Sequence, residues 1–109
     1  MKRGAREREE LFWELADELL VQPSVTRSTM MGYPCLRRRG TFFACVERGT
    51  GHLIVKLPAE RVNELVASAR AIPFAPNGRT FREWAAIPSA DRDVWLALLN
   101  EAQAFAATS

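Results

Sequence analysis

Few side chains in this sequence are suited to covalent or metal chemistry. The chain of 109 residues contains two cysteines, Cys35 and Cys45, and one histidine, His52. Zinc sites usually take their Cys and His ligands as closely spaced pairs, and a catalytic nucleophile needs a neighbouring base that is itself held in place. The spacing of these three residues supplies neither arrangement, so the sequence predicts no metal site, no cofactor and no enzymatic activity.

These three residues have structural interpretations instead. Cys35 and Cys45 fall on neighbouring predicted strands, where a free cysteine usually packs as a small apolar side chain. His52 follows a glycine turn and is expected to be solvated at the start of a strand. The sequence contains no run of about 20 apolar residues, the length that a membrane span requires. Secreted domains of this size often contain more disulfides than this sequence, with its two cysteines, would allow. We therefore expect a cytoplasmic, bacterial protein with reduced thiols.

Basic residues give the sequence its clearest binding pattern. Arg37, Arg38 and Arg39 are consecutive, and residues 25–57 contain six basic side chains against a single acid, Glu47. The segments on either side of this region are mildly acidic, and the net charge of the whole chain is +2. Adjacent guanidinium groups repel one another, and a bound phosphate relieves that repulsion. The three arginines are therefore either a contact for a polyanion or a solvated turn.

The first functional hypothesis is a nucleic-acid contact made by basic hairpins, with DNA as the partner. Phosphate contacts of this kind give affinity without a choice of base sequence. The residues assigned to this contact are Arg37, Arg38, Arg39, Arg48 and Lys56.

The second hypothesis, from a different class of function, is a groove that binds a small anion or a protein partner. It depends on a tryptophan, Trp84, which can present an apolar ring with a polar edge to a ligand. Packing is the alternative role for Trp84, and protection of an exposed sheet face or edge against aggregation is the alternative for Lys56. The residues assigned to the groove are Lys56, Arg79, Arg82 and Trp84.

The spacing of apolar residues along the chain predicts the helices and strands that position these residues. Apolar residues at helical spacing predict a first helix over Arg6–Val21 and a last helix that begins after an N-cap at Ser89 and buries Trp95. Short apolar runs between turn residues predict an antiparallel meander, followed by a helix that opens at Pro58 and one further strand over Arg79–Ile87. The predicted meander strands are Ser24–Met30, Tyr33–Arg38, Thr41–Glu47 and His52–Leu57. The expected fold is α+β, with an antiparallel sheet of about four to five strands flanked by helices.

The motifs in order resemble one known superfamily. "TMMGYPCLRRRGTFFACV", "LIVKLPAERVNELV", "IPFAPNGRTFREWAAIP" and a closing helix with a tryptophan are similar to the TfoX/Sxy amino-terminal domain and the YjbR/MmcQ-like proteins, over residues 27–105. Pro34 and Cys35 depart from the glycine-rich sequence usual after the Met-Gly pair. The residues that carry the resemblance are Met31, Gly32, Gly40 to Phe43, Lys56, Leu57, Phe74, Gly78 and Trp84.

The resemblance implies a fold and a range of functions. It implies an antiparallel sheet flanked by helices, and the length of 109 residues predicts that the chain, residues 1–109, is a single domain of this type. It implies no known catalytic residue and no cofactor. Some relatives regulate natural competence and others are described as DNA-binding, so the resemblance implies DNA as a partner.

Overall fold

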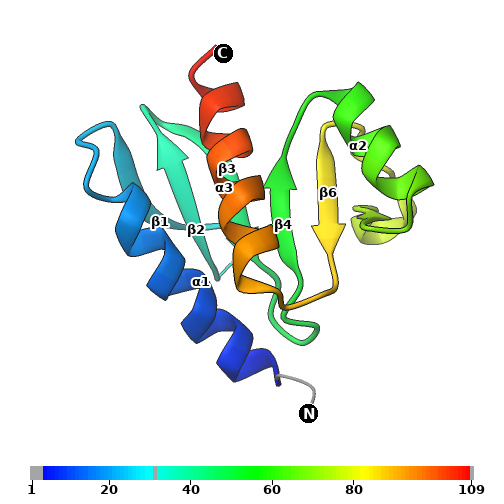
Figure 1. Ribbon diagram of the computed structural model, residues 1–109, viewed down its shortest axis with the longest axis horizontal. Coiled ribbons are helices and arrows are strands. Elements are labelled where there is room, and N and C mark those ends of the chain that lie inside the picture. Colours follow the sequence, from blue (N-terminus) through cyan, green and yellow to red (C-terminus); the bar gives the residue numbers. More distant parts are fainter. Residues whose placement is uncertain (1–3, 31, 109) are drawn as a thin grey trace.

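The computed structural model describes residues 4–30 and 32–108, and within them three helices and six strands form the α+β fold expected from the sequence (Figure 1). Met31, on which part of the family resemblance depends, lies outside the described residues. None of the helices in the described ranges is long and apolar enough to cross a membrane. The elements are α1 Ala5–Leu19, β1 Val25–Met30, β2 Tyr33–Arg38, β3 Thr41–Val46, β4 Leu53–Lys56, α2 Ala59–Ala67, β5 Ile72–Pro73, a single 3₁₀ turn Pro76–Gly78, β6 Trp84–Ile87 and α3 Arg92–Ala106.

The strands form one antiparallel sheet in the order β1-β2-β3-β4-β6-β5. The first four strands are the predicted meander, because each pairs with the next along the chain. The chain then passes through α2, forms β5 at the far edge, and returns as β6 between β5 and β4. The sheet therefore has one strand more than the largest number expected. The additional strand, β5, contains two residues, too few to show an alternating pattern in the sequence.

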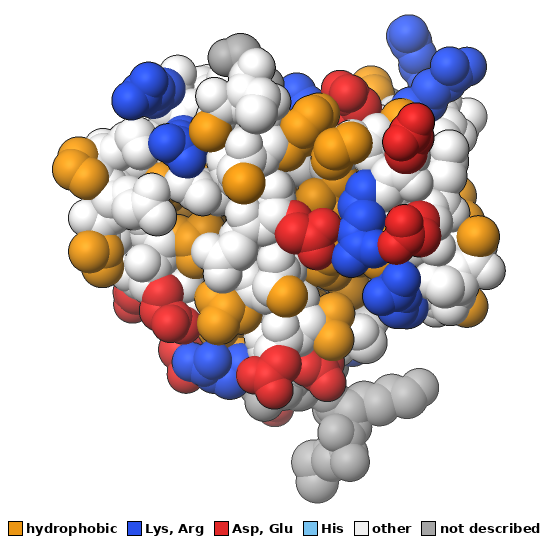
Figure 2. Space-filling view, turned by 45° about the horizontal axis from the view of Figure 1, so that its top comes forward, with side chains coloured by type: hydrophobic (Ala, Val, Ile, Leu, Met, Phe, Trp, Pro, Cys, Tyr) orange, Lys and Arg blue, Asp and Glu red, His pale blue; other side chains and the backbone are white. Residues whose placement is uncertain are grey.

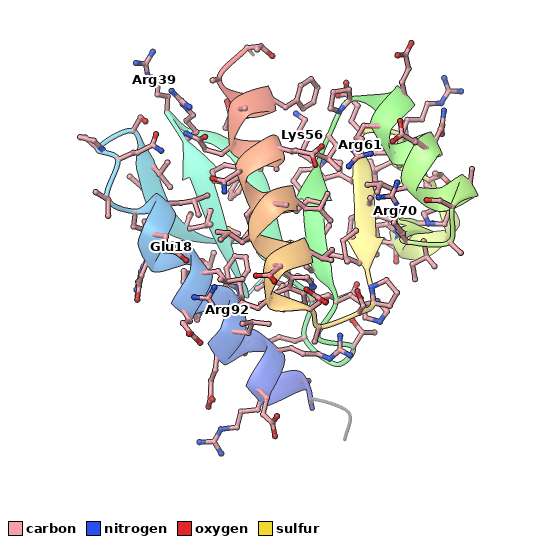
Figure 3. The ribbon with its side chains drawn as sticks, in the orientation of Figure 1. Glu18, Arg39, Lys56, Arg61, Arg70 and Arg92 are labelled. Atoms are coloured by element: carbon pink, nitrogen blue, oxygen red, sulfur yellow. The ribbon has the colours of Figure 1, made fainter. Side chains whose placement is uncertain are left out.

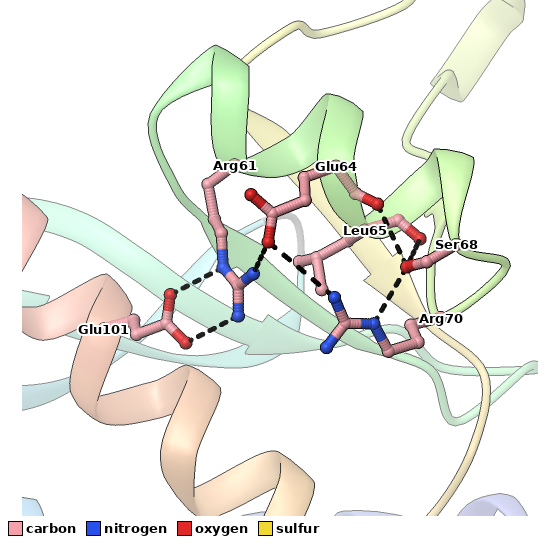
Figure 4. A network of polar contacts seen from close by, with 6 residues as sticks. All are labelled: Arg61, Glu64, Leu65, Ser68, Arg70 and Glu101. Atoms are coloured by element: carbon pink, nitrogen blue, oxygen red, sulfur yellow. Dashed lines mark hydrogen bonds and ion pairs between the residues drawn. The ribbon is translucent and has the colours of Figure 1, made fainter.

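All three helices pack on the same face of the sheet. Figure 1 shows α1 and α3 lying across this face, and Val62 and Leu65 of α2 belong to the same buried cluster as the apolar residues of α1 and α3. The guanidinium of Arg61 joins α2 to α3, since it donates hydrogen bonds of 2.9 and 3.1 Å to the two carboxylate oxygens of Glu101 (Figure 4). The principal core of the domain therefore lies between the helices and one side of the sheet.

A bulge between β2 and β3 interrupts the regular alternation of side chains. Leu36 pairs with Ala44 and Arg37 pairs with Phe42, so Phe43 has no direct partner on β2. One additional residue in a strand shifts the faces to which its neighbours point. Phe43 is fully buried in the helix-side core, whereas the half-buried Phe42 packs with the small cluster on the opposite face.

The ends of two helices correct the sequence prediction. The N-cap of α3 is Asp91 and not Ser89, because the Asp91 carboxylate accepts a hydrogen bond of 3.0 Å from the Val94 N–H. A side-chain acceptor three residues before an N–H is the usual capping geometry, and Ser89 is too early in the chain for that contact. Pro58 likewise is the N-cap of α2 and not its first residue. The burial of Trp95 is confirmed, with 0% of its surface exposed.

Candidate ligand-binding site

The sheet face opposite the three helices, called here the open face, carries a small apolar cluster of its own. Its buried members are Cys35, Cys45, Ile54 and Ala86. Phe42, Phe74 and Trp84 pack against this cluster and are only partly buried. The open face therefore combines an apolar floor with aromatic side chains that remain partly accessible.

A loop between β5 and β6 stands over the open face. This segment, called the 74–81 loop, is closed at its base by a hydrogen bond of 3.0 Å from the Phe81 N–H to the Phe74 carbonyl. The rings of the same two residues lie with their centroids 6.0 Å apart. Asn77 and Gly78 turn the chain with φ of 59° and 78°, the left-handed region that asparagine and glycine tolerate best. The loop thus brings two aromatic rings to the edge of the apolar floor.

A cavity of about 490 Å³ lies between the open face and this loop. Its wall is mostly apolar, with charged groups from only two residues, Glu47 and Arg79. Small-molecule sites are commonly clefts of about 300–1,000 Å³ with apolar walls and a few polar groups. The lining residues are Tyr33, Cys45, Glu47, Ile54, Phe74, Pro76, Asn77, Arg79, Phe81 and Trp84.

A second cavity, of about 460 Å³, adjoins the first and shares the Phe81 and Trp84 side chains with it. Lys56 pairs directly with Trp84 across the β4–β6 ladder, so both side chains point to the open face. The structure therefore brings the four groove residues predicted from the sequence to two neighbouring cavities around Trp84. The lining residues of the second cavity are Lys56, Ala59, Phe81, Arg82, Glu83 and Trp84.

The basic hairpin does not hold its three arginines together. Arg39 occupies the turn itself, with φ of 48°, and is exposed (Figure 3). Arg37 pairs with Phe42 and its guanidinium lies 4.0 Å from the centre of that ring, while the neighbouring Arg38 points to the other face. Both are half-buried, and the Nε atom of each is buried without a hydrogen-bond partner. Arg48 lies in the turn at the opposite end of β3, so it cannot join the other three in one compact patch.

Ion pairs divide the basic residues into two groups. Among the described residues, the acids that form ion pairs lie on α1, α2 or α3, for example in the contacts of Arg92 with Glu14 and Glu18 (Figure 3). Figure 2 shows such acidic and basic side chains next to one another on the surface it displays. Within the described residues, seven basic side chains have no ion pair: Arg37, Arg38, Arg39, Arg48, Lys56, Arg79 and Arg82. All seven lie in strands and loops, and three of them, Lys56, Arg79 and Arg82, line the two cavities.

The two thiols lie side by side on the open face, because Cys35 and Cys45 are direct cross-strand partners. Both are buried and free. Burial raises the pKa of the Cys35 thiol. Burial, helped by the neighbouring Cys35 and the Glu47 carboxylate, raises the pKa of Cys45 to about 12. Since the thiolate is the reactive form of cysteine, Cys45 contributes an apolar wall to the cavity and no nucleophile.

We expect both thiols to be free after denaturation without reductant and slow to react in the native protein. With a pKa of about 12, Cys45 has about one thiolate in ten thousand molecules near pH 8. Mass spectrometry after iodoacetamide treatment should find two added groups in denatured protein and none after a brief reaction of native protein. A mass two hydrogens lower in fresh protein, or rapid native labelling of Cys45, would contradict this expectation.

His52 has the environment of a structural residue. It is half-buried and not fully solvated as expected from the sequence, and burial together with the nearby Arg8 guanidinium lowers its pKa. Within the described ranges, no three Cys, His, Asp or Glu residues form a group that could hold a metal ion.

The sequence did not identify the apolar part of the site. Tyr33 and Ile54 were assigned only to strands, and Phe74 only to a loop. Phe81 was assigned to a strand over Arg79–Ile87, but β6 begins at Trp84, so Phe81 belongs to the loop before it. One signal was available, because Phe74 and Phe81 flank a Pro-Asn-Gly turn, and two aromatic residues on either side of a tight turn can face the same surface.

Comparison with known proteins identifies no match to this chain. No family model, no curated protein and no solved structure matches this chain.

Proposed function

We propose that this domain is a binding module without catalytic chemistry, and that it takes a small, largely apolar molecule into the cavity under the 74–81 loop. The observation that carries the proposal is the cavity itself, which has an apolar floor from the sheet and aromatic walls from the loop and Trp84. Burial of apolar surface is the main source of affinity at such a site. The family resemblance is compatible with this role, because it implies no catalytic residues.

We expect replacement of Phe81 by alanine to weaken the binding of an apolar probe about tenfold. Phe81 lines both cavities and is 41% exposed, so its loss removes part of the binding wall with little effect on the core. The lost contact corresponds to about 1.5 kcal/mol, the lower end for burial of an apolar side chain. The measurement is the fluorescence increase of N-phenylnaphthylamine, a neutral aromatic dye, on titration with protein.

Val94→Ala is the matched control, since Val94 is 39% exposed on α3 and lines neither cavity. This variant should bind the dye as wild type does. Equal affinities for wild type and Phe81→Ala would place the dye elsewhere on the surface and would remove the support for the cavity as the binding site.

Nucleic-acid binding is the second candidate, supported by the seven basic residues without ion pairs. Three of them, Arg37, Arg38 and Arg39, belong to one hairpin. Phosphate contacts by such residues displace counterions from DNA, which makes the affinity fall as salt rises. The half-burial of Arg37 and Arg38 means that substitutions must keep their aliphatic stems, which pack against apolar surface.

We expect weak binding of duplex DNA, near the 10⁻⁴ to 10⁻⁶ M typical of non-specific complexes at physiological salt. Glutamine at Arg37, Arg38 and Arg39 should lower the slope of log affinity against log salt by about two to three units. Fluorescence anisotropy of labelled duplex across a salt series measures the slope. The control variant, with glutamine at Arg6, Arg70 and Arg92, changes the net charge equally but removes arginines that already have acidic partners. Equal slopes for the two variants would show that the hairpin has no special role.

A further inference from the structure

The two cavities around Trp84 differ in chemical character although they share a wall. The first is lined by apolar and aromatic side chains on the floor of the sheet and in the 74–81 loop. The second carries two basic side chains, Lys56 and Arg82, at its boundary. Phe81 and Trp84 belong to both linings, so the two cavities adjoin and a single molecule can extend from one into the other.

The basic groups of the second cavity are available to a ligand. Within the part of the chain that the structure describes, no ion pair joins Lys56 or Arg82 to an acid. Glu83 also lines this cavity, but it is exposed and no ion pair joins it to either basic residue. Lys56 is half-buried and stands directly opposite Trp84 on the neighbouring strand. Its aliphatic stem can therefore pack beside the ring while its ammonium group stays at the boundary.

We propose that the two cavities form one site for an amphipathic organic anion. The apolar part of the ligand occupies the cavity under the 74–81 loop, and its anionic group accepts hydrogen bonds from Lys56 and Arg82 at the second cavity. Charge complementarity favours this occupant over a neutral one, because hydrogen bonds between ionised partners are about twice as strong as neutral ones. This inference rests on the proposed function and specifies the class of ligand for the same site.

Two dyes with the same aromatic ring system separate the apolar contribution to the binding affinity from the anionic contribution. Anilinonaphthalene sulfonate carries a sulfonate that N-phenylnaphthylamine lacks, and both fluoresce more strongly in an apolar environment. We expect wild type to bind the sulfonate about tenfold more tightly than the neutral dye at constant ionic strength. Lys56→Gln combined with Arg82→Gln should abolish this preference and leave the affinity for the neutral dye unchanged, which also shows that the variant is folded.

Arg39→Gln and Arg79→Gln are the single-charge controls. Arg39 lies in the hairpin turn and lines neither cavity, so its replacement should not alter the preference. Arg79 belongs to the apolar cavity, and a loss of preference only in Arg79→Gln would overturn the placement of the anion at the second cavity. Equal affinities of wild type for both dyes would overturn the anionic ligand class but keep the apolar site. Failure of wild type to bind either dye would overturn the proposed function as well.

Discussion

Replacement of Trp95 by alanine is expected to lower the free energy of unfolding by about 3–5 kcal/mol, the usual range for a large aromatic side chain removed from a core. Trp95 is fully buried between α3 and the sheet, and its indole N–H donates a hydrogen bond to the Ser89 carbonyl. The substitution therefore opens a cavity and also leaves a carbonyl without its donor. Small domains have about 5–15 kcal/mol in total, so a large share of the stability is lost.

Urea denaturation followed by circular dichroism measures this change. Val94→Ala, at the adjacent and partly exposed position of the same helix, is the control and should cost much less. A domain of this size shifts its melting temperature by roughly 4–8 °C for each kcal/mol. A melting temperature for Trp95→Ala within a degree or two of wild type would be incompatible with a buried Trp95.

Replacement of Gly51 by alanine is expected to destabilise the fold by about 2–4 kcal/mol, from backbone strain and crowding together. Gly51 has φ of 73°, a left-handed conformation that costs an alanine about 1–2 kcal/mol. A Cβ atom at this position would also lie 2.5 Å from the Arg8 Cδ and 3.0 Å from the Ala5 Cα in the first turns of α1. Arg8 cannot move away freely, because its guanidinium donates to the Pro88 carbonyl.

Gly49 provides the matched control in the same turn. It also has a positive φ, of 93°, but a Cβ atom there meets nothing within 4 Å. Gly49→Ala should therefore show the backbone strain alone, about 1–2 kcal/mol. The difference between the two variants, obtained from urea denaturation, measures the close approach of α1 to the β3–β4 turn. Equal destabilisation by both would mean that this approach contributes nothing.

Elements whose position and bounds depend on residues close to them along the chain could be predicted from the sequence. The strand Tyr33–Arg38 has the predicted bounds, because a glycine before it and an Arg-Gly turn after it limit the extended segment. Trp95 was placed in the core from its position in the apolar stripe of the last helix. By contrast, β5 was missed because two residues, one of them Pro73, show no period. The N-cap of α3 was misplaced because Ser89 and Asp91 are both suitable capping residues.

The candidate site could be predicted only in part, because it depends on contacts between distant segments. Lys56 and Trp84 were both identified, but their direct pairing follows from the return of β6 beside β4, which no local pattern shows. The divergence of Arg37 and Arg38 follows from strand alternation and could have been foreseen. The position of Phe42 on the open face could not, because the bulge that places it there depends on the register with β2.

The order of the strands also decides which two strands lie at the edges of the sheet, and both are poorly suited to pairing with another copy of the protein. Its two outer strands are β1 and β5, and an unpaired strand edge can pair with the edge of another molecule. At one edge, β5 is only two residues long and contains Pro73, which has no N–H to donate. At the other edge, β1 carries threonine, serine and the charged Arg27, which is held by Asp17 of α1. Neither edge offers the long, flat, apolar strand on which aggregation between copies depends.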